Sequence, residues 1–424
     1  MRIFQISKVS PAARGDGGSS ATFATVQALC RAGHEITYAY PQEGTQDADR
    51  EASDRMTEQC GKNLCFLPLP VGGPLLSRPL RMVRTLLGAC WQMGPRGCWD
   101  AGFRPRKVAV RAWRLGCCAT DPFAGLRRRI ETILARSSYD VVQVDYPAML
   151  RVGSRLAASG PRVFVAYEIQ TAMAQQEYPR DRRYCELVSR HESAELRRYD
   201  AVLTLSEEDA AMLRTRLGVQ RVYGSPLAVD CSRLRRPGPR LQADGASRFT
   251  FIGGYRHAPN ADAVAWLCQE IAPRLRAALP GMKVEVIGRY PAGFVRKFSG
   301  PDVSFRGFVE DFSELLWGSI FVCPVRLASG MRIKILDAVL RGAAVISTSV
   351  GAGGLGFVPE VHYLAADSAE AFCRQARRLV ENDLFRQEIC RRAQEQVLSV
   401  FSPEAVARTR AAALEAVIAR HVAL

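Results

Sequence analysis

Short runs of hydrophobic residues alternate along the chain with longer segments that have helical periodicity. In the first half, hydrophobic runs at 2–7, 139–146, 162–169 and 200–206 predict buried strands. The segments between them, such as the charged stretch 182–198, predict helices, and Gly33 predicts the end of the first one. In the second half, Asn260 suits the cap at the start of a helix. Uniformly hydrophobic strands separated by helices are typical of parallel sheets whose two faces are covered by helices. The pattern therefore predicts an α/β fold.

This alternation stops once and then starts again. The segment 235–247 is rich in proline and glycine and predicts a linker, and a second alternating series begins at Phe249. A chain of 424 residues is also long for a single domain. We therefore expect an N-terminal domain over 1–236, a C-terminal domain over 237–400, and a final helix over 401–424 that packs back towards the first domain.

The segment 319–349 combines two strands, a glycine turn and a helix. Its hydrophobic runs 320–322 and 345–346 predict parallel strands, which require a helical crossover, and we expect that helix to begin near Gly330. Helical spacing then places polar residues along one side of the helix, the polar line, and hydrophobic residues on a broad band. We expect the polar line to face a cleft. The polar line is Gly330, Lys334, Asp337 and Arg341, and the band is Ile333, Ile335, Leu336, Val339 and Leu340.

Two cations lie at the predicted start of this helix. In open α/β sheets, ligands bind beyond the carboxyl ends of the strands, where unpaired helix N–H groups attract anions. Arg332 and Lys334 oppose the helix dipole, which favours negative charge at its start by about 0.3–1 kcal/mol. A bound anion would explain their placement, and a diphosphate fits best. The alternative is a solvated helix with incidental charges.

The first βαβ unit carries a glycine-rich loop that lacks the GxGxxG fingerprint. Its second strand ends in Tyr40 and Pro41, where a dinucleotide site needs an acidic residue, so we expect no nicotinamide cofactor. Gly17 and Gly18 would still let a ligand approach the start of the following helix closely.

The composition indicates where the protein is located and what its cysteines do. No stretch of about 18 uncharged hydrophobic residues occurs, and the N-terminus predicts a strand rather than a leader peptide, so we expect a cytoplasmic protein. The 13 cysteines are an odd number without zinc-binding spacing, and we expect them to be reduced and structural. Cys323, for example, lies in a hydrophobic run.

The net charge of +16 would attract phosphates, nucleic acid or anionic lipid. Basic residues and three tryptophans are concentrated between Leu75 and Leu115, with Asp100 as the one acid. This mixture suits peripheral contact with an anionic membrane, whereas the alternative is a pair of arginine-rich surface helices. The basic residues are Arg78, Arg81, Arg84, Arg96, Arg104, Arg106, Lys107, Arg111 and Arg114, with Trp91, Trp99 and Trp113 between them.

Several motifs of the second half together resemble one known family. They are FIGGYRHAPNADAV, VEVIGRY, VSFRGFVED, PVRLASGMRIKILDAV and FSPE. This combination is similar to the nucleotide-sugar domain of retaining glycosyltransferases of the family 4 type. The resemblance implies the GT-B fold, in which two Rossmann-like parallel-sheet domains face each other across a cleft. The N-terminal domain would bind the acceptor and the C-terminal domain the nucleotide-sugar donor.

The resemblance also assigns roles to residues. It implies that Asp337 binds the donor ribose and that Arg332 and Lys334 neutralise the leaving diphosphate. The acidic residue expected eight positions before Asp337 is replaced by Ser329, and Gly254 stands where relatives often have an arginine. The further donor-binding residues implied are Gly17, Gly18, Gly253, Arg256, Gly288, Arg289, Gly307, Phe308, Gly330 and Met331. The acceptor-binding residues implied are Tyr167 and Glu168, and many relatives have histidine at the position of Tyr167.

The implied reaction is a metal-independent, retaining sugar transfer without a cofactor, to a saccharide or a lipid-linked acceptor. The resemblance is typical of polysaccharide or glycoconjugate synthesis, and we expect peripheral contact with the inner face of the membrane. Alternatives within the same fold are a sugar-nucleotide epimerase and a catalytically degenerate binding protein. A nucleic-acid binder would rest on charge alone, because no recognition motif accompanies the charge, so we expect no nucleic-acid partner.

Overall fold

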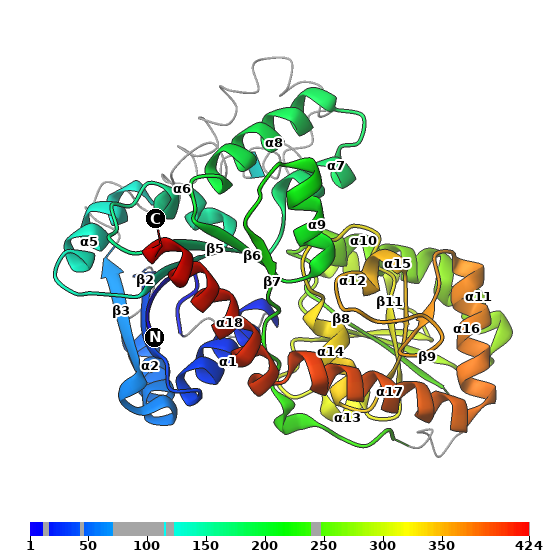
Figure 1. Cartoon of the computed structure of the whole chain (residues 1–424). Helices are drawn as coiled ribbons and strands as arrows, with labels where there is room; N and C mark the ends of the chain where they lie inside the picture. The colour runs from blue at the N-terminus through cyan, green and yellow to red at the C-terminus, as the bar shows by residue number, and fades with distance from the viewer. Residues whose placement is uncertain (12–16, 43–45, 71–113, 116–122, 239–246, 424) are drawn as a thin grey trace. The chain divides into compact units, whose positions relative to one another are not determined.

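The chain folds into two units that each contain a parallel sheet (Figure 1). The structure, a computed structural model, describes residues 1–11, 17–42, 46–70, 114–115, 123–238 and 247–423. Unit 1 consists of Met1–Ala228 and Val406–Leu424, and unit 2 of Val229–Ala405. The predicted basic segment between Leu75 and Leu115 lies outside the described residues, apart from Arg114 and Leu115.

The sheet of unit 1 has seven strands within the described residues, and all neighbouring strands are parallel. Their order is β3-β2-β1-β4-β5-β6-β7, so the chain changes direction across the sheet between β1 and β4. The strands are β1 (Arg2–Ile6), β2 (Glu35–Gln42), β3 (Leu64–Pro70), β4 (Val141–Asp145), β5 (Arg162–Ala166), β6 (Ala201–Thr204) and β7 (Val222–Gly224).

Local signals in the sequence explain where several helices of unit 1 begin and end. The Ser206 side chain accepts a hydrogen bond from the Asp209 N–H at the start of α9, and Asp181 caps α8 in the same way. Gly33, with φ of 88°, follows the end of α1 as predicted. The helices are α1 (Gly17–Arg31), α2 (Gln46–Cys60), α5 (Ala124–Leu134), α6 (Leu150–Ser154), α7 (Gln170–Glu177), α8 (Arg182–Leu196), α9 (Glu207–Arg216) and α18 (Pro403–Val422), with short 3₁₀ turns at Gly61–Asn63 and Pro147–Met149.

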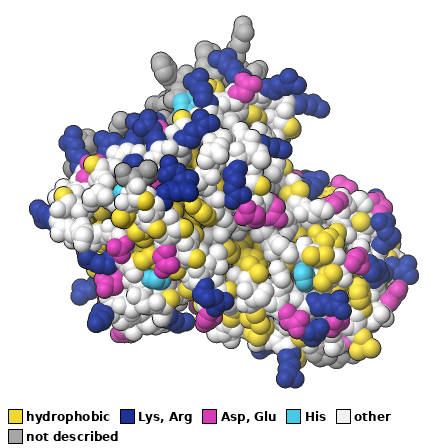
Figure 2. All heavy atoms as spheres, viewed as in Figure 1, with side chains coloured by type: hydrophobic (Ala, Val, Ile, Leu, Met, Phe, Trp, Pro, Cys, Tyr) yellow, Lys and Arg dark blue, Asp and Glu magenta, His cyan; other side chains and the backbone are white. Residues whose placement is uncertain are grey.

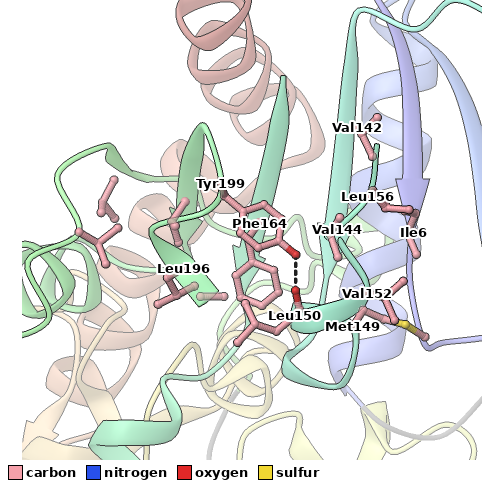
Figure 3. Close-up of a cluster of buried hydrophobic side chains, with 14 of the residues drawn as sticks. Ile6, Val142, Val144, Met149, Leu150, Val152, Leu156, Phe164, Leu196 and Tyr199 are labelled. Carbon is pink, nitrogen blue, oxygen red and sulfur yellow. Dashed lines mark hydrogen bonds between the residues drawn. The ribbon is translucent and has the colours of Figure 1, made fainter. Parts of the chain in front are cut away.

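The core of unit 1 joins β4, β5 and α6 through close packing (Figure 3). The Tyr199 hydroxyl donates to the Leu150 carbonyl over 2.6 Å, so its one polar atom is satisfied inside the core. A Cβ atom at Gly153 would lie 2.4 Å from that hydroxyl and 2.5 Å from Val144, so only glycine fits there. Burying each large hydrophobic side chain in such a core stabilises the fold by roughly 1.5–3 kcal/mol.

Unit 2 has six parallel strands within the described residues, in the order β10-β9-β8-β11-β12-β13. The two sheets confirm the predicted α/β fold with two Rossmann-like domains. The strands are β8 (Arg248–Ile252), β9 (Lys283–Ile287), β10 (Val303–Gly307), β11 (Ile320–Cys323), β12 (Ala344–Ser347) and β13 (Leu364–Ala365). The helices are α10 (Ala258–Trp266), a π-helix (Leu267–Ile271), α11 (Ala272–Ala278), α12 (Ala292–Phe298), α13 (Ser313–Leu316), α14 (Ile333–Leu340), α15 (Ser349–Ala352), α16 (Ala369–Glu381) and α17 (Asp383–Phe401), with a 3₁₀ turn at Cys231–Arg233.

The first residues of the predicted linker pack within unit 2. The Arg235 N–H donates to the Leu340 carbonyl over 2.8 Å, and Arg386 donates to the Gly238 carbonyl over 2.9 Å. A Cβ atom at Gly238 would lie 2.7 Å from the backbone of Gly318. Residues 235–238 are therefore part of the folded unit, and 239–246 lie outside the described residues.

Arg410 fixes α18 to the sheet of unit 1. It is 1% exposed, and its guanidinium donates to the Ser225 hydroxyl over 2.5 Å and to the Ser225 and Pro226 carbonyls over 3.2 and 3.3 Å. Burial lowers its pKa, whereas the negative charge of buried Asp145 acts in the opposite direction. A buried cation with several acceptors is costly to lose, because its partners then remain unsatisfied.

We predict that Arg410→Ala destabilises unit 1 by about 3–5 kcal/mol, because the acceptors at Ser225 and the charge of Asp145 lose their partner. The exposed Arg408 on the same helix provides the control, and Arg408→Ala should change stability by less than about 0.5 kcal/mol. Thermal denaturation of both variants measures the difference. Equal melting temperatures for the two would contradict this role of Arg410.

Candidate functional site

The sheet of unit 2 has its topological switch point between β8 and β11. From these neighbouring strands the chain continues to β9 and β10 on one side and to β12 and β13 on the other. Ligands of open α/β sheets bind in the crevice beyond the carboxyl ends of the strands at such a point. The candidate donor site is therefore built from the residues that follow β8 and β11.

Two glycines at this edge are required by the packing of the chain itself. A Cβ atom at Gly288 would lie 2.4 Å from the Gly253 carbonyl oxygen, and one at Gly253 would lie 2.6 Å from the Asn260 side chain. By contrast, a Cβ atom at Gly254 would meet only the Arg289 carbonyl, at 4.0 Å, and one at Gly307 would meet nothing within 4 Å. Space for a ligand at the backbone thus exists at Gly254 and Gly307.

The crossover helix α14 begins later than the sequence pattern predicts. It starts at Ile333 rather than near Gly330, because Gly330 has a φ of 75° and Arg332 occupies the cap position. Arg332 donates to the Gly351 carbonyl over 2.9 Å and also to the Gly330 carbonyl. Its guanidinium therefore ties the turn to the start of α15. The predicted hydrophobic band of α14 is buried as expected.

Lys334 places its ammonium at the switch point. Its Nζ lies 2.5 Å from the Asn260 Oδ1 atom and 4.7 Å from the centre of the Phe251 ring of β8. Burial is the main reason that the pKa of Lys334 is lowered to about 8, and the positive charge of Arg332 contributes to this shift. Within the part of the chain that the structure describes, no carboxylate forms an ion pair with Lys334. Lys334 is partly buried, and its cation is thus held by neutral groups, an arrangement that suits an anionic ligand.

Asn260 was predicted as a helix cap, and the structure shows a different role. The α10 helix begins at Ala258 with His257 at the cap position, so Asn260 is the third helical residue. Its Nδ2 donates to the Gly254 carbonyl over 3.2 Å while its Oδ1 accepts from Lys334. Sequence reasoning missed this contact because the two residues are 74 positions apart.

The residues of the predicted polar line of α14 do not all face the same place in the structure. Asp337 pairs with Arg341 over 2.9 Å, and Arg341 is buried, with its guanidinium 4.6 Å from the Phe312 ring centre and 3.2 Å from the Ser313 hydroxyl. Arg341 therefore does not face an open cleft, and that expectation was wrong. Asp337 is partly exposed and its pKa is raised by burial, so within this pair it is the residue that can meet a ligand.

The other predicted donor residues lie at the carboxyl ends of the same sheet or just beyond them. Ser329, Gly330 and Met331 precede α14 in the turn that follows β11 and are partly or fully buried. Arg256 is exposed in the turn after β8. Arg289 follows β9 and lies 4.9 Å from the ring centre of Phe308, which follows β10 and is 52% exposed.

Unit 1 has a polar cluster at its own switch point, between β1 and β4. Asp145 is fully buried, and accepts from Gln5 over 2.6 Å and from Gln143 over 3.0 Å. Burial raises the pKa of Asp145 to about 6, although these donors and a hydrogen bond from Tyr167 oppose the shift.

The two predicted acceptor residues contact groups of unit 1. The Tyr167 hydroxyl lies 2.8 Å from the Thr22 hydroxyl, and its ring stacks on Tyr146 with centroids 3.8 Å apart. Thr22 donates to the Gly18 carbonyl, so this chain of hydrogen bonds reaches the glycines Gly17 and Gly18 at the start of α1. Glu168, the next residue, is partly exposed and accepts from Gln170 over 3.0 Å.

Arg114 differs from the surface role predicted for the basic segment. It is 7% exposed, and pairs with Glu177 over 2.9 Å and with Gln170 over 3.0 Å. This arginine therefore stabilises α7 from within unit 1 and does not face a membrane. The other basic residues of the segment lie outside the described residues.

Comparison with known proteins supports the same fold and region. A family model described as glycosyl transferases group 1 matches residues 246–382, and no curated protein matches the chain. Sucrose-phosphate synthase from Thermosynechococcus elongatus is similar, with 15% identity, a TM-score of 0.69 and 99% of both chains covered. HepE from Anabaena, in complex with UDP and glucose, has 14% identity and a TM-score of 0.62, with 98% of this chain and 100% of that chain covered. TarM from S. aureus, in a complex that contains UDP, has 10% identity and a TM-score of 0.67, with 97% of this chain and 99% of that chain covered.

These similarities confirm the GT-B fold, and the family match over unit 2 supports a glycosyltransferase. Among the described residues, no three His, Cys, Asp or Glu side chains come together as metal ligands. No helix in the described ranges is both long and hydrophobic enough to span a membrane.

We predict that Gly288→Ala disrupts the edge of the sheet, because its Cβ atom would collide with the Gly253 carbonyl and its φ of 141° is unfavourable for alanine. The expected loss is about 1–3 kcal/mol of stability in unit 2. Gly254→Ala is the matched control and should be tolerated, since its Cβ atom has space. Thermal denaturation tests both, and an unchanged Gly288→Ala melting temperature would refute the packing argument.

Proposed function

We propose that the protein is a retaining, metal-independent glycosyltransferase that moves a sugar from a nucleotide diphosphate donor to an acceptor. The observation that carries this proposal is the partly buried ammonium of Lys334, held by neutral groups at the switch point of unit 2. A diphosphate would supply the missing negative charge. The match to the glycosyltransferase family model, over residues 246–382, includes this whole region, and HepE and TarM have been solved with UDP.

In this proposal each part of the donor meets a different set of residues. The diphosphate lies against Lys334 and the turn that contains Gly330, Met331 and Arg332. Asp337 accepts hydrogen bonds from the ribose, and Ser329 lies next to the sugar. The turn after β8 completes the site, with Gly253, Gly254 and Arg256. The base lies between the ends of β9 and β10, at Gly288, Arg289, Gly307 and Phe308.

The chemistry proposed is mainly electrostatic. As the bond to the leaving diphosphate breaks, negative charge grows on its oxygen atoms, and fixed donors at Lys334 and the α14 backbone stabilise that charge. One well-placed donor of this kind can lower the barrier by about 3–4 kcal/mol. In the proposed retaining mechanism, the sugar passes through an oxocarbenium-like state, and the leaving phosphate helps to accept the acceptor proton.

Unit 1 would bind the acceptor, a saccharide or a lipid-linked sugar. Glu168 is the better candidate for a direct contact, because it is partly exposed, whereas the Tyr167 hydroxyl bonds to Thr22. Tyr167 would then act through its position next to Gly17 and Gly18. A catalytically degenerate binding protein is the second candidate, and this internal bonding of Tyr167, together with Ser329 and Gly254, favours it.

Peripheral contact with an anionic membrane is also part of the proposal. Figure 2 shows basic side chains gathered on the viewed face of unit 1, and exposed arginines occur on α5, at Arg128 and Arg129, and on α8, at Arg182 and Arg183. The basic segment between Leu75 and Leu115 adds further positive charge and tryptophans. A lipid-linked acceptor would agree with such contact.

We predict that one nucleotide sugar, from a panel of UDP, GDP, dTDP and ADP sugars, raises the melting temperature and is slowly hydrolysed. Lys334→Ala should weaken that binding by about 10–100-fold, because a charged hydrogen bond to phosphate is lost. Lys297→Ala, at an exposed lysine of α12, is the matched control and should bind normally. Calorimetry and a hydrolysis assay measure both effects.

Each result has a clear meaning. Binding and turnover that depend on Lys334 support the transferase. Binding without turnover, even with crude lipid acceptor present, supports the degenerate binding protein. If no member of the panel binds, the proposal fails.

We predict that the protein floats with vesicles that contain phosphatidylglycerol at low salt and stays in solution with neutral vesicles. Replacement of Arg104, Arg106 and Lys107 by serine should reduce flotation more than replacement of Arg128 and Arg129 on α5. The reason is that only the first group lies among tryptophans. A protein that does not float at low salt would exclude the membrane contact.

A further inference from the structure

We infer that Asn260 is a positioning residue for Lys334, and that its neutral amide fixes the ammonium while leaving the positive charge available for the diphosphate of the donor. This inference rests on the proposed function for the identity of the ligand. It goes beyond that function by adding a residue from a second helix to the site, one that makes no proposed contact with the donor.

The amide of Asn260 is fixed at both ends. Its Oδ1 accepts from Lys334 at 2.5 Å and its Nδ2 donates to the Gly254 carbonyl at 3.2 Å. The side chain is only 7% exposed, so water does not replace these partners easily. The contact joins α10 to α14 across the switch point between β8 and β11.

Asparagine is the side chain of this size that can serve both partners. An aspartate would direct a second acceptor at the Gly254 carbonyl, and an alanine would leave that carbonyl with only the His257 N–H at 3.4 Å and would remove the hydrogen-bond acceptor of the ammonium. Gly253 makes room for the amide, because a Cβ atom there would lie 2.6 Å from the Asn260 Cγ and Nδ2 atoms. Gly253, Asn260 and Lys334 therefore form one structural unit.

The groups that face Lys334 explain why a neutral partner matters. They are the Asn260 amide, the Phe251 ring, the Cys323 thiol and the Arg332 guanidinium. Burial raises the pKa of Cys323, so this thiol is uncharged at neutral pH. Three of the four groups are neutral and the fourth is positive, so the local charge of the site favours an anion. A carboxylate at position 260 would neutralise Lys334 before any ligand arrives.

The isosteric variant Asn260→Asp tests this inference directly. We expect it to weaken binding of nucleoside diphosphate, and of inorganic pyrophosphate, by about tenfold or more at pH 7. In the native protein, affinity should also fall as the pH rises through about 8, because Lys334 loses its proton. In Asn260→Asp this fall should move to higher pH, because the new carboxylate raises the pKa of Lys334. A purely structural asparagine would not shift the pH profile.

Gln269→Glu is the matched control, because it makes the same amide-to-acid change at an exposed position of the π-helix that follows α10. It should bind diphosphate like the native protein. Equal losses in both variants, or a native pH profile in Asn260→Asp, would overturn the inference.

A measurement without ligand separates this inference from the proposed function. The chain has only six lysines, so the Lys334 side chain can be followed by NMR in the free, full-length protein. Its pKa should lie near 8 in the native protein and clearly higher in Asn260→Asp. If this shift is seen but no nucleotide sugar binds, the proposed function fails and the positioning role remains. If the pKa of Lys334 is the same in both, the positioning role fails.

Discussion

The candidate site depends on one interaction, the contact of the partly buried Lys334 ammonium with an amide and an aromatic ring. A buried cation is expensive unless it is compensated, and its pKa of about 8 reflects that cost. The hydrogen bond to Asn260 and the contact with Phe251 reduce the cost without neutralising the charge. This arrangement suits an anion. Packing against the Asn260 side chain explains Gly253, whereas Gly254 and Gly307 leave space for a ligand.

In unit 1, the buried group at the switch point of the sheet is the acidic residue Asp145, and its surroundings differ from those of Lys334. Asp145 accepts hydrogen bonds from Gln5 and Gln143, and the charge of Arg410 from α18 acts on it. Its partners Gln5, Gln143 and Tyr167 all belong to unit 1, so this carboxyl group holds them in place inside the unit. The same topology therefore produces a structural centre in unit 1 and a candidate anion site in unit 2, because the latter cation has no acidic partner among the described residues.

The fold could be predicted from the sequence because it depends on a local property, the alternation of hydrophobic strands with amphipathic helices. The site could be predicted only in part. The pattern placed Lys334 and Asp337 on the polar side of the crossover helix, yet it placed the start of α14 near Gly330, because it could not show that Gly330 has a positive φ. Contacts between residues far apart in the sequence could not be predicted either. Asn260 looked like a helix cap, and Arg114 looked like part of a basic surface, until the structure showed their buried partners.

Strand order explains how the proposed donor site can have a cation although the chain lacks the arginine of the family motif. The resemblance places a cation directly after the first strand of the donor domain, and this chain has Gly254 there. The β8 strand is hydrogen-bonded to β11, so a cation carried by the helix after β11 reaches the same crevice from the other side. Lys334 is this cation, and it contacts the Phe251 ring of β8. It also donates to Asn260, which in turn donates to the Gly254 carbonyl, so these contacts connect the two sides of the crevice. Lys334 lies 80 positions after Gly254 in the sequence, yet both lie at the same crevice, because parallel strands bring their carboxyl ends together at the switch point.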